Sequence, residues 1–153
     1  MNSTAEFSTT STYITRSCLV VPIQEELTAE AAQRIQWSIL KQIHTTDIKG
    51  VIIDLSGVNI IDRILWEIFS KTTQMIQMLG FSYVIAGLNP GVVASIIALN
   101  LNIENIATAM DLESALKILN PAEETNVNNI GDVENDDDMR DEAEKTLDND
   151  DLL

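Results

Sequence analysis

The chain has 153 residues, of which 45% are apolar and 22% charged, and its formal net charge is −15. This length predicts one domain, and the apolar content is sufficient for a core. The charge is uneven: residues 122–153 contain thirteen acidic and two basic residues, whereas residues 1–121 contain eleven and seven. Without a basic patch on the domain, nucleic acid is not an expected partner.

The sequence predicts neither a membrane-spanning segment nor a secretory signal peptide. No apolar run reaches the roughly 18 residues of a membrane span, and the opening MNSTAEFSTTST lacks the basic start and apolar core of a signal peptide. The single cysteine, Cys18, excludes an intramolecular disulfide and lies in an apolar run that favours burial. We therefore expect a cytoplasmic protein with no membrane contact.

The first half of the chain predicts two strands, a helix and a third strand. Residues 1–10 are rich in Ser and Thr and are expected to be flexible, and residues 11–16 and 18–23 are expected to form two short strands joined by a tight connection. Thr28 is a suitable N-cap for a helix that ends near His44. Residues 50–54 are apolar on both faces, as in a central parallel strand.

The second half predicts three helices that alternate with two strands. Asp62 caps a helix that runs from Arg63 to Leu79, and Gly80 ends it. The remaining elements are a strand over 82–86, a helix capped by Asn89, a weak strand over 103–108, and a helix capped by Asp111 that ends at Leu119.

The predicted fold class is α/β. The order of elements implies a mixed, mostly parallel sheet of about five strands with about four helices, in which the first two strands form an antiparallel pair. The domain is predicted to span residues 11–120, and the acidic tail, residues 121–153, is predicted to be disordered because it has high charge and few apolar residues.

Catalytic signals are sparse. The one histidine, His44, is expected to be a capping or surface residue at a helix end, and the sequence has neither metal-ligand spacing nor a glycine-rich phosphate loop. Asp54 ends a parallel strand, where α/β enzymes place ligands, but a turn carboxylate that binds backbone N–H groups is the simpler interpretation. We expect no cofactor and no enzymatic activity.

Arg63 stands in an unusual place, directly after the N-cap Asp62. The N-terminus of a helix carries partial positive charge, so an arginine there is unfavourable by roughly 0.3–1 kcal/mol. Opposite the apolar arc of the same helix lie Trp66, Glu67 and Ser70, and an exposed Trp beside an Arg is typical of a protein-recognition surface. In the alternative interpretation, Trp66 folds over the apolar edge and Arg63 pairs with Glu67.

A series of ordered segments carries a family resemblance. DLSGV and I-I-D follow an apolar strand, an amphipathic helix then ends in M-x-x-L-G, and V-x-A-G-x-x-P precedes a short helix. This pattern, over residues 11–119, resembles the STAS domain of anti-sigma-factor antagonists. CLVVPIQEELT and TAMDLESALKIL resemble the small scaffold protein of the stressosome, the RsbS type.

The resemblance implies a non-enzymatic scaffold that assembles with STAS-domain sensor paralogues (RsbR type), holds a switch serine kinase (RsbT type), and is reset by a phosphatase. It implies homo-oligomers and large hetero-oligomers. The family's phosphoacceptor follows the helix-capping Asp, which Asp62 matches, but that position is Arg63 here. Arginine cannot accept the phosphoryl group, so we expect an insensitive switch site.

Two serines are candidate phosphosites in its place. Ser95 occupies the position of a second family acceptor, on the short helix after G-x-x-P, and Ser56 lies in the turn before Asp62. The simpler interpretation of Ser95 is a small polar residue at a helix edge.

Two other functions stay open. One is a simple antagonist that binds an anti-sigma kinase without a large assembly, and the other is a small nucleotide-binding or enzymatic α/β domain that uses Asp54. The acidic tail either keeps an assembly soluble or competes for a basic surface on a partner.

Overall fold

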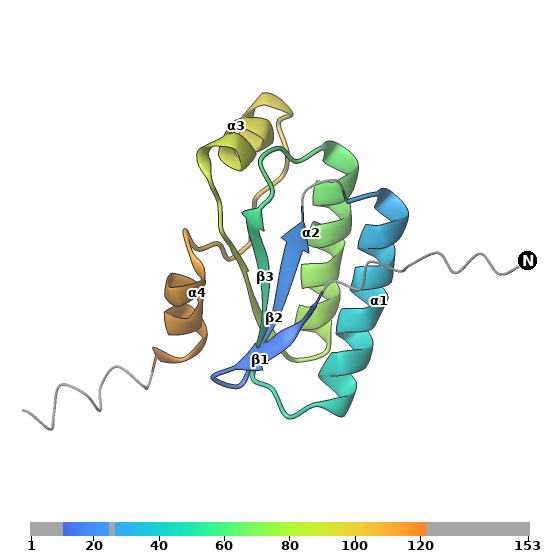
Figure 1. Ribbon diagram of the computed structural model, residues 1–153, viewed down its shortest axis with the longest axis vertical. Coiled ribbons are helices and arrows are strands. Elements are labelled where there is room, and N and C mark those ends of the chain that lie inside the picture. The colour runs from blue at the N-terminus through green and yellow to red at the C-terminus, as the bar shows by residue number, and fades with distance from the viewer. Residues whose placement is uncertain (1–10, 25–26, 122–153) are drawn as a thin grey trace, which may run out of the picture. The chain divides into compact units, whose positions relative to one another are not determined.

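A computed structural model describes residues 11–24 and 27–121, so residues 1–10 and all of the predicted tail except Pro121 lie outside the described residues. The strands of the described chain form one sheet in the order β1-β2-β3-β4 (Figure 1). The strands are β1 (Tyr13–Thr15), β2 (Cys18–Gln24), β3 (Gly50–Gly57) and β4 (Ser82–Ala86). The helices are α1 (Ala29–Thr45), α2 (Arg63–Met78), α3 (Pro90–Ala98) and α4 (Leu112–Leu119).

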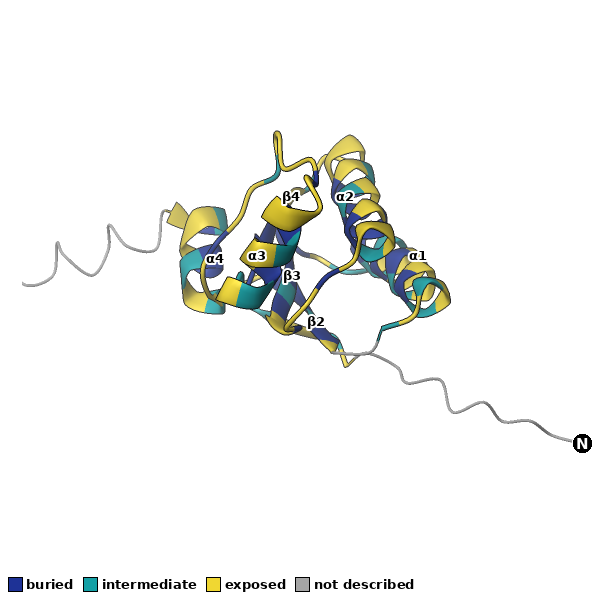
Figure 2. Ribbon diagram, turned by 90° about the horizontal axis from the view of Figure 1, so that it is seen from above, coloured by how far each residue is buried: buried dark blue, intermediate teal, exposed yellow. Residues whose placement is uncertain are grey.

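The sheet is mixed and mostly parallel, as predicted. β1 pairs antiparallel with β2, while β3 lies between β2 and β4 and runs parallel to both. A central strand of this kind is buried on both faces, which explains why Val51, Ile52 and Ile53 are consecutive apolar residues with no exposed surface. The two faces differ in what covers them: α1 and α2 cover one, and α4 the other (Figures 1 and 2).

The side chains of the strands alternate between these two faces. The α1 and α2 side holds the larger core, to which β3 contributes Val51, Ile53 and Leu55, while Ile52 faces the α4 side. Because the carboxyl ends of β2 and β3 meet at one end of the sheet, the connections that leave them lie together there. α3 lies across this same end (Figures 1 and 2).

The helix ends follow the predicted capping chemistry. The side chains of Thr28, Asp62, Asn89 and Asp111 each accept a backbone N–H of the helix that they precede. None of the helices in the described ranges is long and apolar enough to cross a membrane.

The prediction of about five strands is wrong at residues 103–108. Within residues 11–24 and 27–121 the sheet has four strands, and this segment contributes a single parallel bridge, between Ile85 and Thr108. Asn105 has a φ of 62°, in the left-handed region, and the backbone N–H of Ile106 donates back to the Ile103 carbonyl. A turn of this kind prevents the extended conformation that a ladder of hydrogen bonds needs.

Candidate functional site

The start of α2 is the part of the structure where the predicted site residues lie. Asp62 caps the helix, because its Oδ1 accepts the N–H of Leu65 at 2.8 Å. Arg63 is the first helical residue and is exposed, and its Nη2 donates to the carbonyl of Leu99, the C-cap of α3. Its guanidinium therefore lies at the negative end of a second helix, which offsets its unfavourable position on its own helix.

Trp66 is a correction to the sequence analysis. It was expected to be exposed, but it is 2% exposed, and its Nε1 donates to the carbonyl of Asn102 at 2.9 Å. The segment that follows α3 supplies an acceptor for the one polar group of the indole, which a helical wheel cannot show. Trp66 thus joins the core, whereas the apolar side chain of Ile64, two residues earlier on the same helix, is 60% exposed.

Arg63, Glu67 and Ser70 nevertheless lie together, along a groove of about 280 Å³. The groove runs between α2 and the segment after α3, and Trp66 contributes to its wall. Glu67 is exposed and Ser70 is half-buried. Three of the four predicted partner-binding residues thus share one accessible surface, and the fourth supports it from inside.

α3 is fastened to the segment that precedes α2. The side-chain amide of Asn89 donates to the Val58 carbonyl at 2.6 Å, and Ser95 Oγ accepts the N–H of Ile61 at 3.4 Å. At Gly91 the backbone approaches the Asn59 carbonyl so closely that a Cβ would collide with it. With the Arg63–Leu99 hydrogen bond, these contacts join α3 to residues 58–63 at four places along its length, and we call them the α3 seam.

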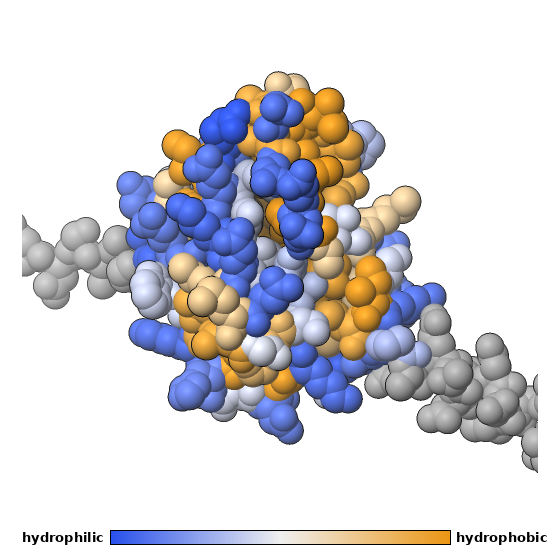
Figure 3. Space-filling view, turned by 180° about the vertical axis from the view of Figure 1, so that it is seen from behind, coloured by the Kyte–Doolittle hydropathy of each residue, from blue (hydrophilic) through white to orange (hydrophobic). Residues whose placement is uncertain are grey.

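Four large exposed apolar side chains belong to α3 or to residues 60–64, the two segments that lie at the seam, and we call them the apolar patch. Ile60 is 75% exposed and Ile97 is 70% exposed, and Ile64 and Val93 are also open to solvent. Figure 3 shows hydrophobic residues gathered over the end of the molecule where α3 lies. Exposed apolar surface of this kind often marks a protein-interaction site. The sequence analysis missed it, because Ile64 and Val93 fit an apolar helix stripe as well as a surface.

The order of a buried strand, a helix capped by Asp62 and a short helix capped by Asn89 is the order on which the sequence resemblance depends, and a family comparison tests that resemblance. The model of the STAS domain matches residues 9–115. The chain belongs to the STAS family. The resemblance stated from the sequence is thereby confirmed.

The chain is also similar to a curated protein in sequence and to two solved structures in fold. The chain is 29% identical over 104 residues to the RsbT co-antagonist protein RsbRD of Bacillus subtilis (strain 168), a match over 67% of this chain and 37% of that protein. It therefore spans well under half of the length of this relative. A variant of RsbS from Moorella thermoacetica has a TM-score of 0.66 at 23% identity, covering 76% of this chain and 99% of that one. A structure described as the molecular architecture of the stressosome has a TM-score of 0.61 at 22% identity, with 72% and 96% covered.

The two serine candidates differ in how their hydroxyl groups are used. Ser95 is half-buried, and its Oγ donates to the Gly91 carbonyl at 2.9 Å besides accepting the N–H of Ile61. Ser56 is exposed, near the end of β3. Its backbone N–H donates to Asp54 Oδ1 at 2.9 Å, so Asp54 acts as the turn carboxylate of the simpler interpretation.

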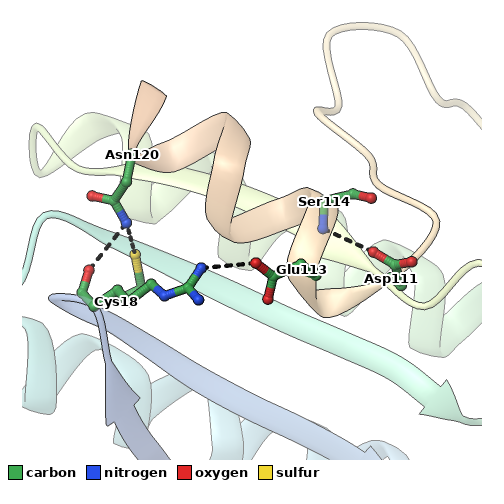
Figure 4. A network of polar contacts seen from close by, with 6 residues as sticks. Cys18, Asp111, Glu113, Ser114 and Asn120 are labelled. Atoms are coloured by element: carbon green, nitrogen blue, oxygen red, sulfur yellow. Dashed lines mark hydrogen bonds and ion pairs between the residues drawn. The ribbon is translucent and has the colours of Figure 1, made fainter. Parts of the chain in front are cut away.

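Two further residues from the sequence analysis, His44 and Cys18, lie outside the groove. His44 is exposed in the last turn of α1, as expected for a surface residue. Cys18 is buried, and its Sγ accepts a hydrogen bond from Nδ2 of Asn120 at 3.5 Å (Figure 4). Residues 11–24 and 27–121 contain no cluster of His, Cys, Asp and Glu that could hold a metal ion.

Proposed function

We propose that this STAS protein is a non-enzymatic, cytoplasmic scaffold and partner-switch component of a stressosome-like signalling complex. The observation that carries the proposal is the surface at the start of α2, where Arg63, Glu67 and Ser70 line an open groove beside exposed Ile64. Two relatives bear on its partners: the RsbT co-antagonist RsbRD by sequence, and a stressosome structure by fold. The partners proposed are STAS sensor paralogues of the RsbR type, a serine kinase of the RsbT type and a phosphatase.

The first experiment measures assembly. The full chain is mixed with an RsbR-type paralogue and an RsbT-type kinase, and the molar mass is measured by light scattering after size exclusion. A megadalton species that retains the kinase supports the scaffold. A complex of a few tens of kilodaltons would instead indicate a simple anti-sigma-factor antagonist.

The groove itself can be tested by charge reversal. Glu67→Lys changes an exposed groove residue and should weaken kinase or paralogue binding at least tenfold, because like charges or unpaired charges at an interface cost more than 1.4 kcal/mol. Lys41→Glu on α1 is the control, since Lys41 is also exposed but does not line the groove. Equal binding by the wild type and both variants would remove the groove from the proposal.

We also propose that Arg63 makes the usual switch position insensitive to phosphorylation. A kinase assay compares the wild type with Arg63→Ser, and mass spectrometry locates the phosphate. Phosphate on the first turn of α2 in Arg63→Ser alone supports the proposal. Equal incorporation in that turn in both proteins would contradict it.

Ser95 is the proposed alternative phosphosite, with Ser56 as the second candidate. A phosphoryl group on Ser95 would remove the hydroxyl donor to Gly91 and add charge beside the N–H of Ile61. Phosphorylation there would therefore replace the present hydrogen bonds of the Ser95 hydroxyl, one of which belongs to the α3 seam. Phosphate in the wild type that persists in Ser95→Ala and disappears in Ser56→Ala would assign the site to Ser56.

A further inference from the structure

α3 has a local cap at its N-terminal end, but its own sequence supplies no charge that stabilises either end. It has nine residues, PGVVASIIA, with no acidic residue in its first turn and no basic residue in its last. Helices this short are marginal in isolation and depend on tertiary contacts. Its buried side chains are Val92 and Ile96, so one narrow stripe holds it to the core.

The α3 seam supplies what this sequence lacks. At the N-terminal end, Asn89 caps the helix through Oδ1 and binds Val58 through Nδ2. Near the middle, Ser95 links the helix to Ile61. At the C-terminal end, Arg63 donates to the Leu99 carbonyl, one of the acceptors that a helix leaves unpaired.

We infer that Arg63 is a fixed clamp on α3: its cation, contributed by another helix, caps the C-terminus of α3 and sets the position of that helix. The guanidinium lies between the ends of two helices whose dipoles act on its positive charge in opposite directions. It is unfavourable at the positive end of α2 and favourable at the negative end of α3, and it makes a charge-assisted hydrogen bond only with the second. Arg63 thus destabilises the start of its own helix slightly and stabilises its neighbour.

The clamp has a consequence for the exposed surface. Ile97 lies on the last turn of α3, two residues before Leu99, and Ile64 follows Arg63 on α2. A hydrogen bond that holds Leu99 against Arg63 therefore holds the α3 and α2 parts of the apolar patch in one arrangement. A serine or threonine, whose side chain is much shorter, would not span the same distance.

Hydrogen exchange tests this clamp without any partner, so its outcome is independent of the proposed scaffold function. In the full chain, Arg63→Met should raise the exchange rates of the amides of Leu99, Asn100 and Leu101 about fivefold, since all three donate to carbonyls in the last turn of α3. The amide of Val93, which donates to Asn89 at the other end, should change less. Lys41→Met is the matched control, because it removes one exposed positive charge from α1, far from the seam in sequence.

Inverting the charge at residue 63 distinguishes a specific clamp on α3 from a general contribution of Arg63 to the stability of the domain. Arg63→Glu should slow exchange of the Leu65 and Trp66 amides at the start of α2, because an acid suits that dipole, while it speeds exchange at the end of α3. Arg63→Lys should lie between the wild type and Arg63→Met at α3. Changes of the same sign at both helices, or an effect of Arg63→Met no larger than that of Lys41→Met, would overturn the inference.

Discussion

α3 and α4 are both short, with α3 across one end of the sheet and α4 on one of its faces, and they are stabilised in different ways. α4 carries its own electrostatic complements: Asp111 as N-cap, Glu113 in the first turn and Lys117 in the last. α3 carries neither kind of charge and relies on Arg63 and the segment before it. Local sequence therefore supplies caps or charges at both ends of α4, whereas α3 has a local cap only at its N-terminal end, and its C-terminal end depends on Arg63, which lies 36 positions before Leu99.

The contacts that attach α4 and α3 to the rest of the domain also differ. α4 packs Ala115 and Leu116 on a core cluster and is tied to the β1–β2 hairpin by the Arg16–Glu113 ion pair and by Asn120 (Figure 4). α3 is held by residues of the segment before α2: the Val58 carbonyl accepts from Asn89, the N–H of Ile61 donates to Ser95, and Arg63 donates to Leu99. Each helix buries two side chains, but α4 also packs partly buried Leu112 and Leu119 on its cluster, and a helix with more packed apolar surface resists local opening better. We expect α3 to be the less stable of the two.

The largest expected effect is on the packing of α4. Leu116 is 4% exposed, and Leu116→Ala should lower the free energy of unfolding by about 2–5 kcal/mol, since it opens a cavity against the sheet. Urea denaturation measures the change. Ile118→Ala, at a 52% exposed position of the same helix, is the control and should change it by less than about 0.5 kcal/mol. Similar losses for both variants would show that burial does not distinguish these positions.

The next effect is on the close approach of α3 to the connecting segment. Replacing a helical glycine by alanine usually stabilises a helix by up to about 1 kcal/mol. At Gly91 the added Cβ would meet the Asn59 carbonyl oxygen, which is backbone and cannot turn away. Gly91→Ala should therefore destabilise the domain by about 1–3 kcal/mol. A raised melting temperature would mean that helix propensity outweighs the collision.

A smaller effect is expected where α4 meets the hairpin. The side-chain Nδ2 of Asn120 donates to the Arg16 carbonyl at 3.1 Å as well as to Cys18. Because Arg16 is exposed, water can replace Asn120 as the partner of its carbonyl, and Asn120→Ala should cost only about 0.5–1.5 kcal/mol. Hydrogen exchange should quicken at the end of α4 and leave α3 unchanged. Faster exchange in α3 would show that the two helices are coupled.

The smallest expected effect is a pH dependence that distinguishes the N-cap of α4, Asp111, from the N-cap of α3, Asn89. The N–H of Ser114 donates to the carboxylate of Asp111 at 2.8 Å, which lowers the pKa of Asp111 below its ordinary value of 3.8, and the hydroxyl of Ser114 and the charge of Lys117 act in the same direction. A pKa depressed by folding contributes stability above the unfolded pKa, and that stability is lost as the pH falls through the folded value. Exchange at the start of α4, corrected for the intrinsic rate, should therefore quicken in acid.

The cap of α3 should not show this dependence. Asn89 is an amide, so it does not titrate at acid pH. Asp111→Asn is the matched variant, because asparagine keeps a capping oxygen but carries no charge. An acid response that persists in Asp111→Asn would assign the titration to another group.

Much of the fold could be predicted from short-range patterns. The four helix caps, the left-handed residues Gly80 and Asn100, and the central strand β3 all follow from chemistry within a few residues of each position. The prediction of a fifth strand is wrong because Asn105 adopts a left-handed conformation, which its apolar neighbours do not indicate. The prediction that Trp66 is exposed is wrong because the carbonyl of Asn102, which is distant in sequence, accepts the hydrogen bond of its indole N–H.

By itself, the sequence determined the family, the alternation of elements, and the unusual place of Arg63 directly after its cap. Those features depend on periodicity and on neighbours along the chain, which a sequence displays. Only the tertiary structure decided what Arg63 does: it places the C-terminus of α3 within reach of the guanidinium. The physical reason is that a helix end acts through space, so the cost of a cation at the start of α2 is visible in the sequence, while its gain at the end of α3 is not.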